Sequence, residues 1–184
     1  MMLSTEYSRL CDSAEIKILE PVKGAKSIVL MPDSFSVMAQ GRQTERGSWT
    51  AYLLNQSLLD FIERPATKET GIAGTTEYER VSTIGERILR SKPGSNAQTK
   101  YVYEPINEIT AEYEIHSEKL TLERGAELGL GGARIEIRRR NDGHLVAYAQ
   151  YYWSNKEFRA CPKESHNGLF IYKFIAGALN VERN

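Results

Sequence analysis

Residues 133–153 place the strongest constraint on what this chain can fold into. They read ARIEIRRRNDGHLVAYAQYYW, two stretches of alternating apolar and polar residues around Asn141-Asp142-Gly143. Alternation with a period of two indicates β-strands, and a connection ending in Asp-Gly favours a tight turn. We therefore predict a β-hairpin with a three-residue loop, in which Gly143 is left-handed and Arg140 pairs with His144.

The predicted pairing sorts the hairpin side chains onto two faces, because successive residues of a strand point to opposite sides of the sheet. The apolar face carries Ile135, Ile137, Leu145, Ala147, Ala149, Tyr151 and Trp153, with Arg139 near the turn. The opposite face carries Glu136, Arg138, Arg140, His144, Val146, Tyr148 and Gln150. Arg139 thus points away from Arg138 and Arg140, so the three consecutive arginines cannot all contact one partner.

The rest of the chain shows both strand and helix patterns. Strands are predicted over residues 15–20, 27–31, 35–39 and 109–116, with a turn or bulge at 117–119 where the apolar positions change face. Helices are predicted over residues 5–13 and 77–90, a short helix followed by a strand within 48–63, and polar loops at 64–74 and 91–96. Residues 168–179 form a last strand or a short helix docked on the sheet. These elements predict a β-rich α+β fold, with a mostly antiparallel sheet of hairpins and two or three peripheral helices.

Size and charge limit the class of protein. At 184 residues the chain is expected to form one domain, residues 1–184, because single cores split only beyond roughly 250 residues. Lys plus Arg and Asp plus Glu both number 24, and this neutrality argues against a protein that binds nucleic acid by neutralising phosphates. No stretch approaches the ~20 apolar residues of a membrane helix, so no transmembrane segment is predicted. The first residues show no signal peptide, so export would require a signal upstream of Met1.

The sequence lacks recognisable motifs for catalysis, metal binding or cofactor binding. The glycine-rich run GAELGLGG at residues 125–132 precedes a predicted strand, whereas a dinucleotide-binding loop follows a strand and opens a helix. We interpret it as a turn that leads into the hairpin. The three histidines are scattered and no CxxC occurs, so neither a metal site nor a cofactor is predicted. His116 and His144 are expected on polar strand faces and His166 in a loop.

The two cysteines, Cys11 and Cys161, lie near opposite ends of the chain. They form either two free buried thiols or a disulfide that closes most of the chain into a loop. Cys161 precedes Pro162, and no predicted helix N-terminus lies beside it to lower its pKa, so a nucleophilic role is not favoured. An oxidising compartment would favour the disulfide.

Arg138, Arg140, Tyr148 and Tyr152 form the one predicted grouping with a binding chemistry. Guanidinium groups beside aromatic rings can hold an anion or the carboxylate of a partner. The competing and simpler interpretation is a solvated sheet face, on which arginine stems cover aromatic surface.

Several ordered segments together resemble a family of uncharacterised exported proteins of proteobacteria, periplasmic or lipoprotein-like. The segments are Cys11 ahead of IKILEPVKGAKSIVLM, then GLGGARIEIRRRNDGHLVAYAQYYW, then RACP and a final apolar FIYKFI. Members of that family show a cysteine followed by a KIY-x-x-V strand and a G-x-x-x-x-I-x-D-x-x-T-G-E-x-L-A hairpin, and close with Tyr-Trp and Cys-Pro. This chain departs from the pattern with Asn141-Asp142 where threonine is usual. The resemblance implies export and a Cys11–Cys161 bridge, and it implies no activity.

These features lead to three hypotheses of different classes. The first is a non-enzymatic module of the periplasm or cell envelope that interacts with a protein partner or binds a small ligand, with no nucleic acid involved. The alternative is a small hydrolase-type enzyme that uses a histidine and a carboxylate brought together by the fold. A third is a cytoplasmic adaptor or nucleic-acid-associated protein, which the missing signal peptide leaves open.

Overall fold

The computed structural model describes residues 2–33, 49–56, 58–70, 72, 74–84, 100–166 and 170–181. The helices are α1 (Met2–Asp12), α3 (Trp49–Gln56), α4 (Gly125–Leu128) and α5 (Phe170–Ala178), with the 3-10 turns η2 (Lys68–Thr70) and η3 (Lys163–His166). The strands are β1 (Glu15–Ile18), β2 (Ser27–Leu30), β3 (Phe61–Pro65), β4 (Tyr78–Ile84), β5 (Lys100–Ile106), β6 (Tyr113–Lys119), β7 (Leu130–Arg139), β8 (Leu145–Ser154) and β9 (Arg159–Cys161). The predicted strand at 35–39 and loop at 91–96 lie outside the described residues.

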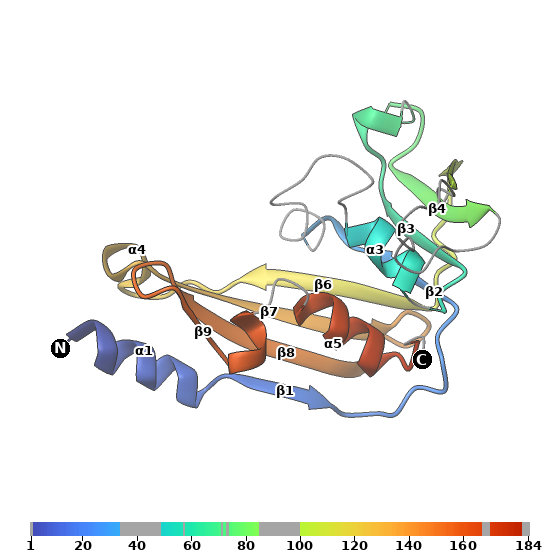
Figure 1. Ribbon diagram of the computed structural model, residues 1–184. Coiled ribbons are helices and arrows are strands. Elements are labelled where there is room, and N and C mark those ends of the chain that lie inside the picture. Colours follow the sequence, from blue (N-terminus) through green and yellow to red (C-terminus); the bar gives the residue numbers. More distant parts are fainter. Residues whose placement is uncertain are drawn as a thin grey trace, which may run out of the picture.

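One mixed sheet organises these elements (Figure 1). Its strand order is β1-β8-β7-β6-β2-β3-β4-β5, and β9 also pairs with β8. The β-rich α+β class is as predicted, but the sheet is not purely antiparallel, because β2 runs parallel to both β3 and β6. All four residues of β2 are buried, as expected for a strand covered on both faces. The continuous apolar run at 27–31 is therefore explained by burial of this strand on both faces.

The hairpin β7–β8 forms the centre of the longer part of the sheet, and its turn differs from the prediction. Gly143 is left-handed, with φ of 68°, but Arg139 rather than Arg140 bonds to His144. The register then shifts beyond Ile137, so that Arg138 lies opposite Leu145. This bulge turns Val146 into the core, where it is fully buried. The predicted faces are correct from Ala147 onwards. Leu145, predicted on the apolar face, lies on the opposite one, and Val146, predicted on the opposite face, lies on the apolar one.

The glycine-rich run ahead of the hairpin is shaped by the aromatic residues of β8. Gly129 ends the single turn of α4 in the left-handed conformation, with φ of 69°, and β7 begins at the next residue. A Cβ on Gly131 would lie 2.3 Å from the Trp153 ring, and one on Gly132 would lie 2.7 Å from the Tyr152 ring. Glycine is required at both positions so that these rings can lie across β7.

The main core fills the space between the sheet and α5, which lies across β7 and β8 (Figure 1). Residues 168–179 were expected to form either a last strand or a short helix docked on the sheet. The docked helix is the one that forms. Most of α5 is buried, because it is apolar around nearly its whole circumference. Phe170 meets the edge of the Tyr151 ring, with 5.3 Å between ring centroids.

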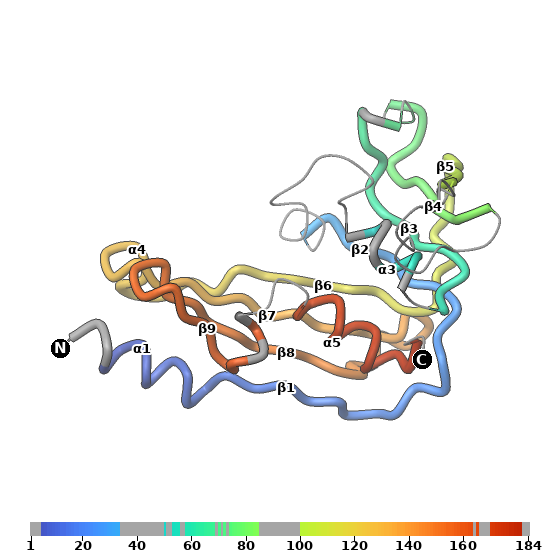
Figure 2. Tube along the Cα trace, viewed as in Figure 1, coloured from blue at the N-terminus to red at the C-terminus, as the bar shows by residue number. Residues whose placement is uncertain are grey.

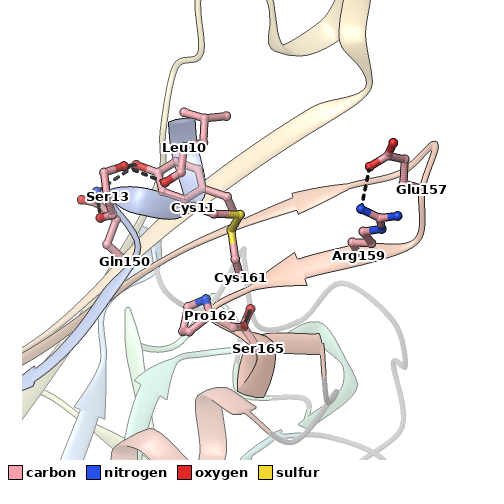
Figure 3. Close-up of a disulfide and its surroundings, with 10 residues drawn as sticks. Leu10, Cys11, Ser13, Gln150, Glu157, Arg159, Cys161, Pro162 and Ser165 are labelled. Atoms are coloured by element: carbon pink, nitrogen blue, oxygen red, sulfur yellow. Dashed lines mark hydrogen bonds and ion pairs between the residues drawn. A yellow bond between two sulfur atoms is a disulfide. The ribbon is translucent and has the colours of Figure 1, made fainter. Parts of the chain in front are cut away.

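A second, smaller core lies beneath α1 and includes Tyr7, Leu10, Tyr152 and Cys161. The Cys11–Cys161 disulfide, with an S–S distance of 2.09 Å, joins the end of α1 to β9 (Figure 3). Leu120 packs against the same cluster. The predicted turn or bulge at 117–119 is wrong, since β6 continues to Lys119. The apolar positions change face because α1 covers this end of the sheet.

The helix predicted over residues 77–90 is a strand over its described part, β4. Tyr78, Val81 and Ile84 satisfy a helical spacing, but burial alternates along this segment, with Glu79 and Val81 inward. The prediction was wrong because Glu79 faces inward. A charged residue at a buried position interrupts the alternation of apolar and polar residues by which a strand is recognised. Its partner, Arg64, was assigned to a polar loop and instead lies inside β3.

Burial of Tyr151 predicts a loss of stability in alkali. Burial raises the pKa of Tyr151 to about 12, so between about pH 10 and 12 the folded residue keeps a proton that the unfolded one has lost. The free energy of unfolding is expected to fall by about 3 kcal/mol across this range. Urea denaturation at several alkaline pH values checks this, and Tyr151→Phe should show a shallower decline. An identical decline in both proteins would contradict it.

Candidate functional site

The four residues of the predicted binding face, Arg138, Arg140, Tyr148 and Tyr152, lie in different environments. Tyr152 is only 5% exposed beneath α1, and its hydroxyl contacts Ser13 and Gln150. Tyr148 and Arg138 both lie on the sheet face opposite α5. Arg140 lies at the end of the hairpin and turns toward the β5–β6 connection. The fold therefore does not bring the four together as one surface.

The open sheet face around Tyr148 carries a series of paired charges. Glu136 accepts hydrogen bonds from Arg134 and Arg138 on the same strand, at 2.8 Å and 2.6 Å. Burial raises the pKa of Glu136, but the two arginines outweigh it and hold this pKa below the ordinary value. The Arg134 guanidinium also lies 4.3 Å from the centre of the Tyr148 ring. Both arginines thus already have a carboxylate partner, which supports the solvated-face interpretation.

The same pattern continues onto β1. Glu15 binds Lys17 at 2.6 Å and accepts a hydrogen bond from the Tyr148 hydroxyl. Hydrogen bonds from Lys17 and Tyr148 lower the pKa of the exposed Glu15 carboxyl. Charges on this face thus stabilise one another within the chain.

The histidines lie beside carboxylates at the surface. His144 Nε2 lies 3.1 Å from Glu20, where the two side chains are 52% and 44% exposed. His116 lies 3.2 Å from Glu114 and 3.4 Å from Asp33. The fold therefore brings a histidine and an acid together twice, as the hydrolase hypothesis requires, but Cys161 is held in the disulfide and offers no nucleophile. His166 lies in η3.

An open cleft of about 480 Å³ lies between the β5–β6 connection and the end of the hairpin. Its lining is formed by Thr110, Ala111, Glu112, Tyr113, Arg139, Arg140 and Asn141. Arg139 and Arg140 contribute two neighbouring positive charges, and Thr110 and Tyr113 contribute hydroxyl groups. We take this cleft, termed the arginine cleft below, as the candidate functional site.

A buried carboxylate holds one wall of the arginine cleft in place. Glu63 is fully buried in β3 and accepts hydrogen bonds from the backbone N–H groups of Thr110 and Ala111, at 2.9 Å and 3.0 Å. The Thr110 hydroxyl and Arg80 complete its coordination. Because a buried carboxylate without partners is costly, the connection between β5 and β6 is fixed to β3 at this point.

The hairpin supplies the other wall through its arginines. Arg140 N–H donates to Glu112 O at 3.0 Å, which extends the pairing of β6 and β7 past the ends of both strands. Arg140 Nη1 donates to the carbonyl oxygens of Ile109 and Ala111, at 2.8 Å and 3.3 Å. The Arg140 guanidinium is therefore fixed in orientation by main-chain oxygens, and no carboxylate of a described residue forms an ion pair with it.

Arg139 and Tyr113 differ from Arg140 in their surroundings. Arg139 forms ion pairs with Glu20 and with Asp142, the second at 3.1 Å. Tyr113 lies opposite Arg139 in the sheet, and burial raises the pKa of its hydroxyl. The arginine cleft thus combines an arginine paired with carboxylates, an arginine whose partners among the described residues are carbonyl oxygens, and a phenol.

Sequence reasoning missed the two ion pairs that support this region. Glu63 lies opposite Arg80, and Arg64 lies opposite Glu79, in the antiparallel pair β3–β4. Both carboxylates are fully buried, and Arg64 is only 2% exposed. The signal was two Glu-Arg dipeptides, at 63–64 and 79–80, since antiparallel pairing places the glutamate of each opposite the arginine of the other.

Comparison with known proteins gives no assignment: no protein-family model, no curated protein and no solved structure matches this chain. None of the helices formed by the described residues combines the length and apolar character needed to cross a bilayer. Across the same parts of the chain, no three residues with metal-binding side chains gather into one group. The class of protein that the fold defines is a disulfide-bridged, β-rich α+β protein with an arginine-lined cleft.

Proposed function

We propose that the protein is a non-enzymatic domain of the periplasm or cell envelope that binds a small oxyanion-bearing ligand in the arginine cleft. The observation that carries the proposal is the orientation of Arg140. Its guanidinium is held in place by two main-chain carbonyls and lacks a carboxylate partner among the described residues. A guanidinium held in position in this way is suited to a carboxylate or a phosphate, which it contacts with parallel N–H donors.

The compartment is inferred from the cysteines. A disulfide that joins α1 to β9 persists where the surroundings are oxidising, and the bacterial periplasm is one such compartment. The resemblance of the chain's two ends to an exported family supports the same location.

The remaining lining limits the charge of the ligand. Glu112 lies in the same cleft as the arginines, and its carboxylate repels a second negative charge placed beside it. The arginine cleft is therefore better suited to a ligand with one anionic group than to a polyphosphate. Tyr113 supplies a hydroxyl that can donate to such a group.

Titration with two probes tests this function. Acetate and inorganic phosphate are added separately while the backbone amide signals of Asn141 and Glu112 are followed by NMR. We expect saturable shifts for at least one probe, and Arg140→Met should weaken the binding by about 10- to 100-fold, because a hydrogen bond to a charged group contributes roughly 1.5–3 kcal/mol. Absence of saturable shifts with both probes would contradict the proposal.

Arg138→Met provides the matched control. It removes a nearby arginine of the same hairpin that is already paired with Glu136, so probe binding should be unchanged. Thermal unfolding of both variants is measured in parallel, because Arg140 also bonds to the β5–β6 connection. Equal losses of probe binding in the two variants would mean that general charge, and not Arg140, is responsible.

A further inference from the structure

We propose that two copies of this chain pair through the outer edge of β1, with the strands antiparallel and centred on Ile16. This inference goes beyond the proposed ligand binding and does not depend on it. β1 is a terminal strand of the sheet order, and no described segment lies along its outer side (Figure 2).

The hydrogen-bonding groups of β1 alternate between β8 and the outer edge. Leu19 N–H donates to Val146 O, which marks Leu19 as a residue whose main chain faces β8. Alternation in an antiparallel pair then directs the main chains of Glu15 and Lys17 to β8, and those of Ile16 and Ile18 outward. The outer edge of β1 thus presents N–H and C=O groups of Ile16 and Ile18 that another strand can pair with.

Large apolar side chains are exposed along the same edge. Ile16, Ile18 and Leu19 are 42%, 54% and 52% exposed. Ile16 and Ile18 lie opposite Ala149 and Ala147, so they are on the face of the sheet that α5 covers. Addition of a strand beside β1 would place apolar residues of the added strand beside Ile16 and Ile18 and remove apolar surface of both strands from water.

The charges of β1 identify the partner as a second copy. The strand reads Glu-Ile-Lys-Ile, and a two-fold axis at Ile16 places each Glu15 opposite Lys17 of the other copy. An axis at Lys17 would place lysine opposite lysine, and an axis at Glu15 would place glutamate opposite glutamate. A lysine on an edge strand commonly blocks such pairing, but here the preceding glutamate makes the pattern self-complementary. Only the Ile16-centred register gives two attractive pairs.

The pairing also agrees with the directions of the main-chain groups. In the Ile16-centred register the two Ile16 residues form a hydrogen-bonded pair, which requires their N–H and C=O groups to face outward, as they do. Glu15 and Lys17 then form non-hydrogen-bonded pairs, in which opposing side chains approach most closely. The strand is four residues long, so the dimer is expected to be weak and concentration-dependent.

Sedimentation velocity over a range of concentrations tests the pairing, with the natural chain compared to variants in which the charge of Glu15 or Lys17 is reversed. The natural chain is expected to dimerise reversibly. Glu15→Lys leaves only lysines at the two positions and Lys17→Glu leaves only glutamates, so each variant alone should dimerise at least about tenfold more weakly. A mixture of the two variants should form a heterodimer, because both lysines of the first variant then lie opposite the two glutamates of the second.

Two further variants separate this edge from other surfaces. Lys100→Glu makes the same charge change as Lys17→Glu, but on β5, the other terminal strand of the sheet. It should leave dimerisation unchanged. Ile16→Pro removes an outward N–H without breaking the pairing with β8, so it should abolish the dimer and keep the folded monomer. A natural chain that stays monomeric at all soluble concentrations overturns the proposal, as does a mixture of charge variants that fails to associate. A dimer that Ile16→Pro leaves intact also overturns it.

Discussion

Replacing Glu79 by glutamine is expected to destabilise the protein by about 3–5 kcal/mol, because it removes the carboxylate that lies against the buried Arg64 guanidinium. Arg64 Nη2 lies 2.8 Å from Glu79 Oε1, and the two side chains are 3% and 0% exposed. Thr50 accepts a hydrogen bond from Arg64, and Thr70 donates one to Glu79. Urea denaturation of the natural protein and the variant measures the loss.

A double replacement shows where the loss arises. Arg64→Met with Glu79→Leu removes both charges and fills the space with apolar side chains, so it should be markedly more stable than Glu79→Gln alone. Glu6→Gln removes a partner of the exposed Arg9 pair and should have no measurable effect. A double variant as unstable as the single one would show that the ion pair itself provides the stability, and that the loss is not the cost of burying Arg64 without Glu79.

Replacing both cysteines by serine is expected to lower the free energy of unfolding by about 2–5 kcal/mol. The Cys11–Cys161 bridge joins residues 150 positions apart, and closing a loop of that length restricts the unfolded chain by about 5 kcal/mol in the chain-entropy model. Observed values fall below this model, which sets the lower end of the expected range. Urea denaturation of the oxidised protein and of the double serine variant measures the difference.

The reduced natural protein gives a second readout of the same bridge. Its denaturation midpoint should match that of the double serine variant, and limited proteolysis should cut first near α1, which the bridge ties to β9. Native, unreduced protein should gain no iodoacetamide label. Two labels on native protein would contradict both the disulfide and the extracytoplasmic location proposed from it.

The arginine cleft depends on contacts between distant parts of the chain. Glu63 fixes residues 110–111 from β3, and Arg140 fixes the same connection from the end of the hairpin. The cleft wall is therefore clamped between the two halves of the sheet. Loss of the Glu63 contacts would shift the wall without changing any residue that faces the ligand.

Some of the candidate site was predictable and some was not. The sequence predicted a hairpin that ends in Arg139, Arg140 and Gly143, and it placed Arg139 on the opposite face from its neighbours. It grouped Arg140 with Tyr148 and Tyr152, which the structure separates. The error came from positions along the strands, because Arg140 lies at the end of the hairpin and binds the β5–β6 connection, whereas Tyr152 is covered by α1.

Local alternation in the sequence was sufficient to determine the β7–β8 hairpin, its buried face from Ala147 onwards and the α+β class, because a period of two depends only on neighbouring residues. The tertiary structure alone decided that β2 pairs in parallel with β3 and β6, and that Glu63 and Glu79 are buried. Those outcomes depend on the register between segments far apart in the chain, where a charged residue can be buried once the fold supplies its partner. The arginine cleft belongs to this second group, because its two walls meet only when the sheet is complete.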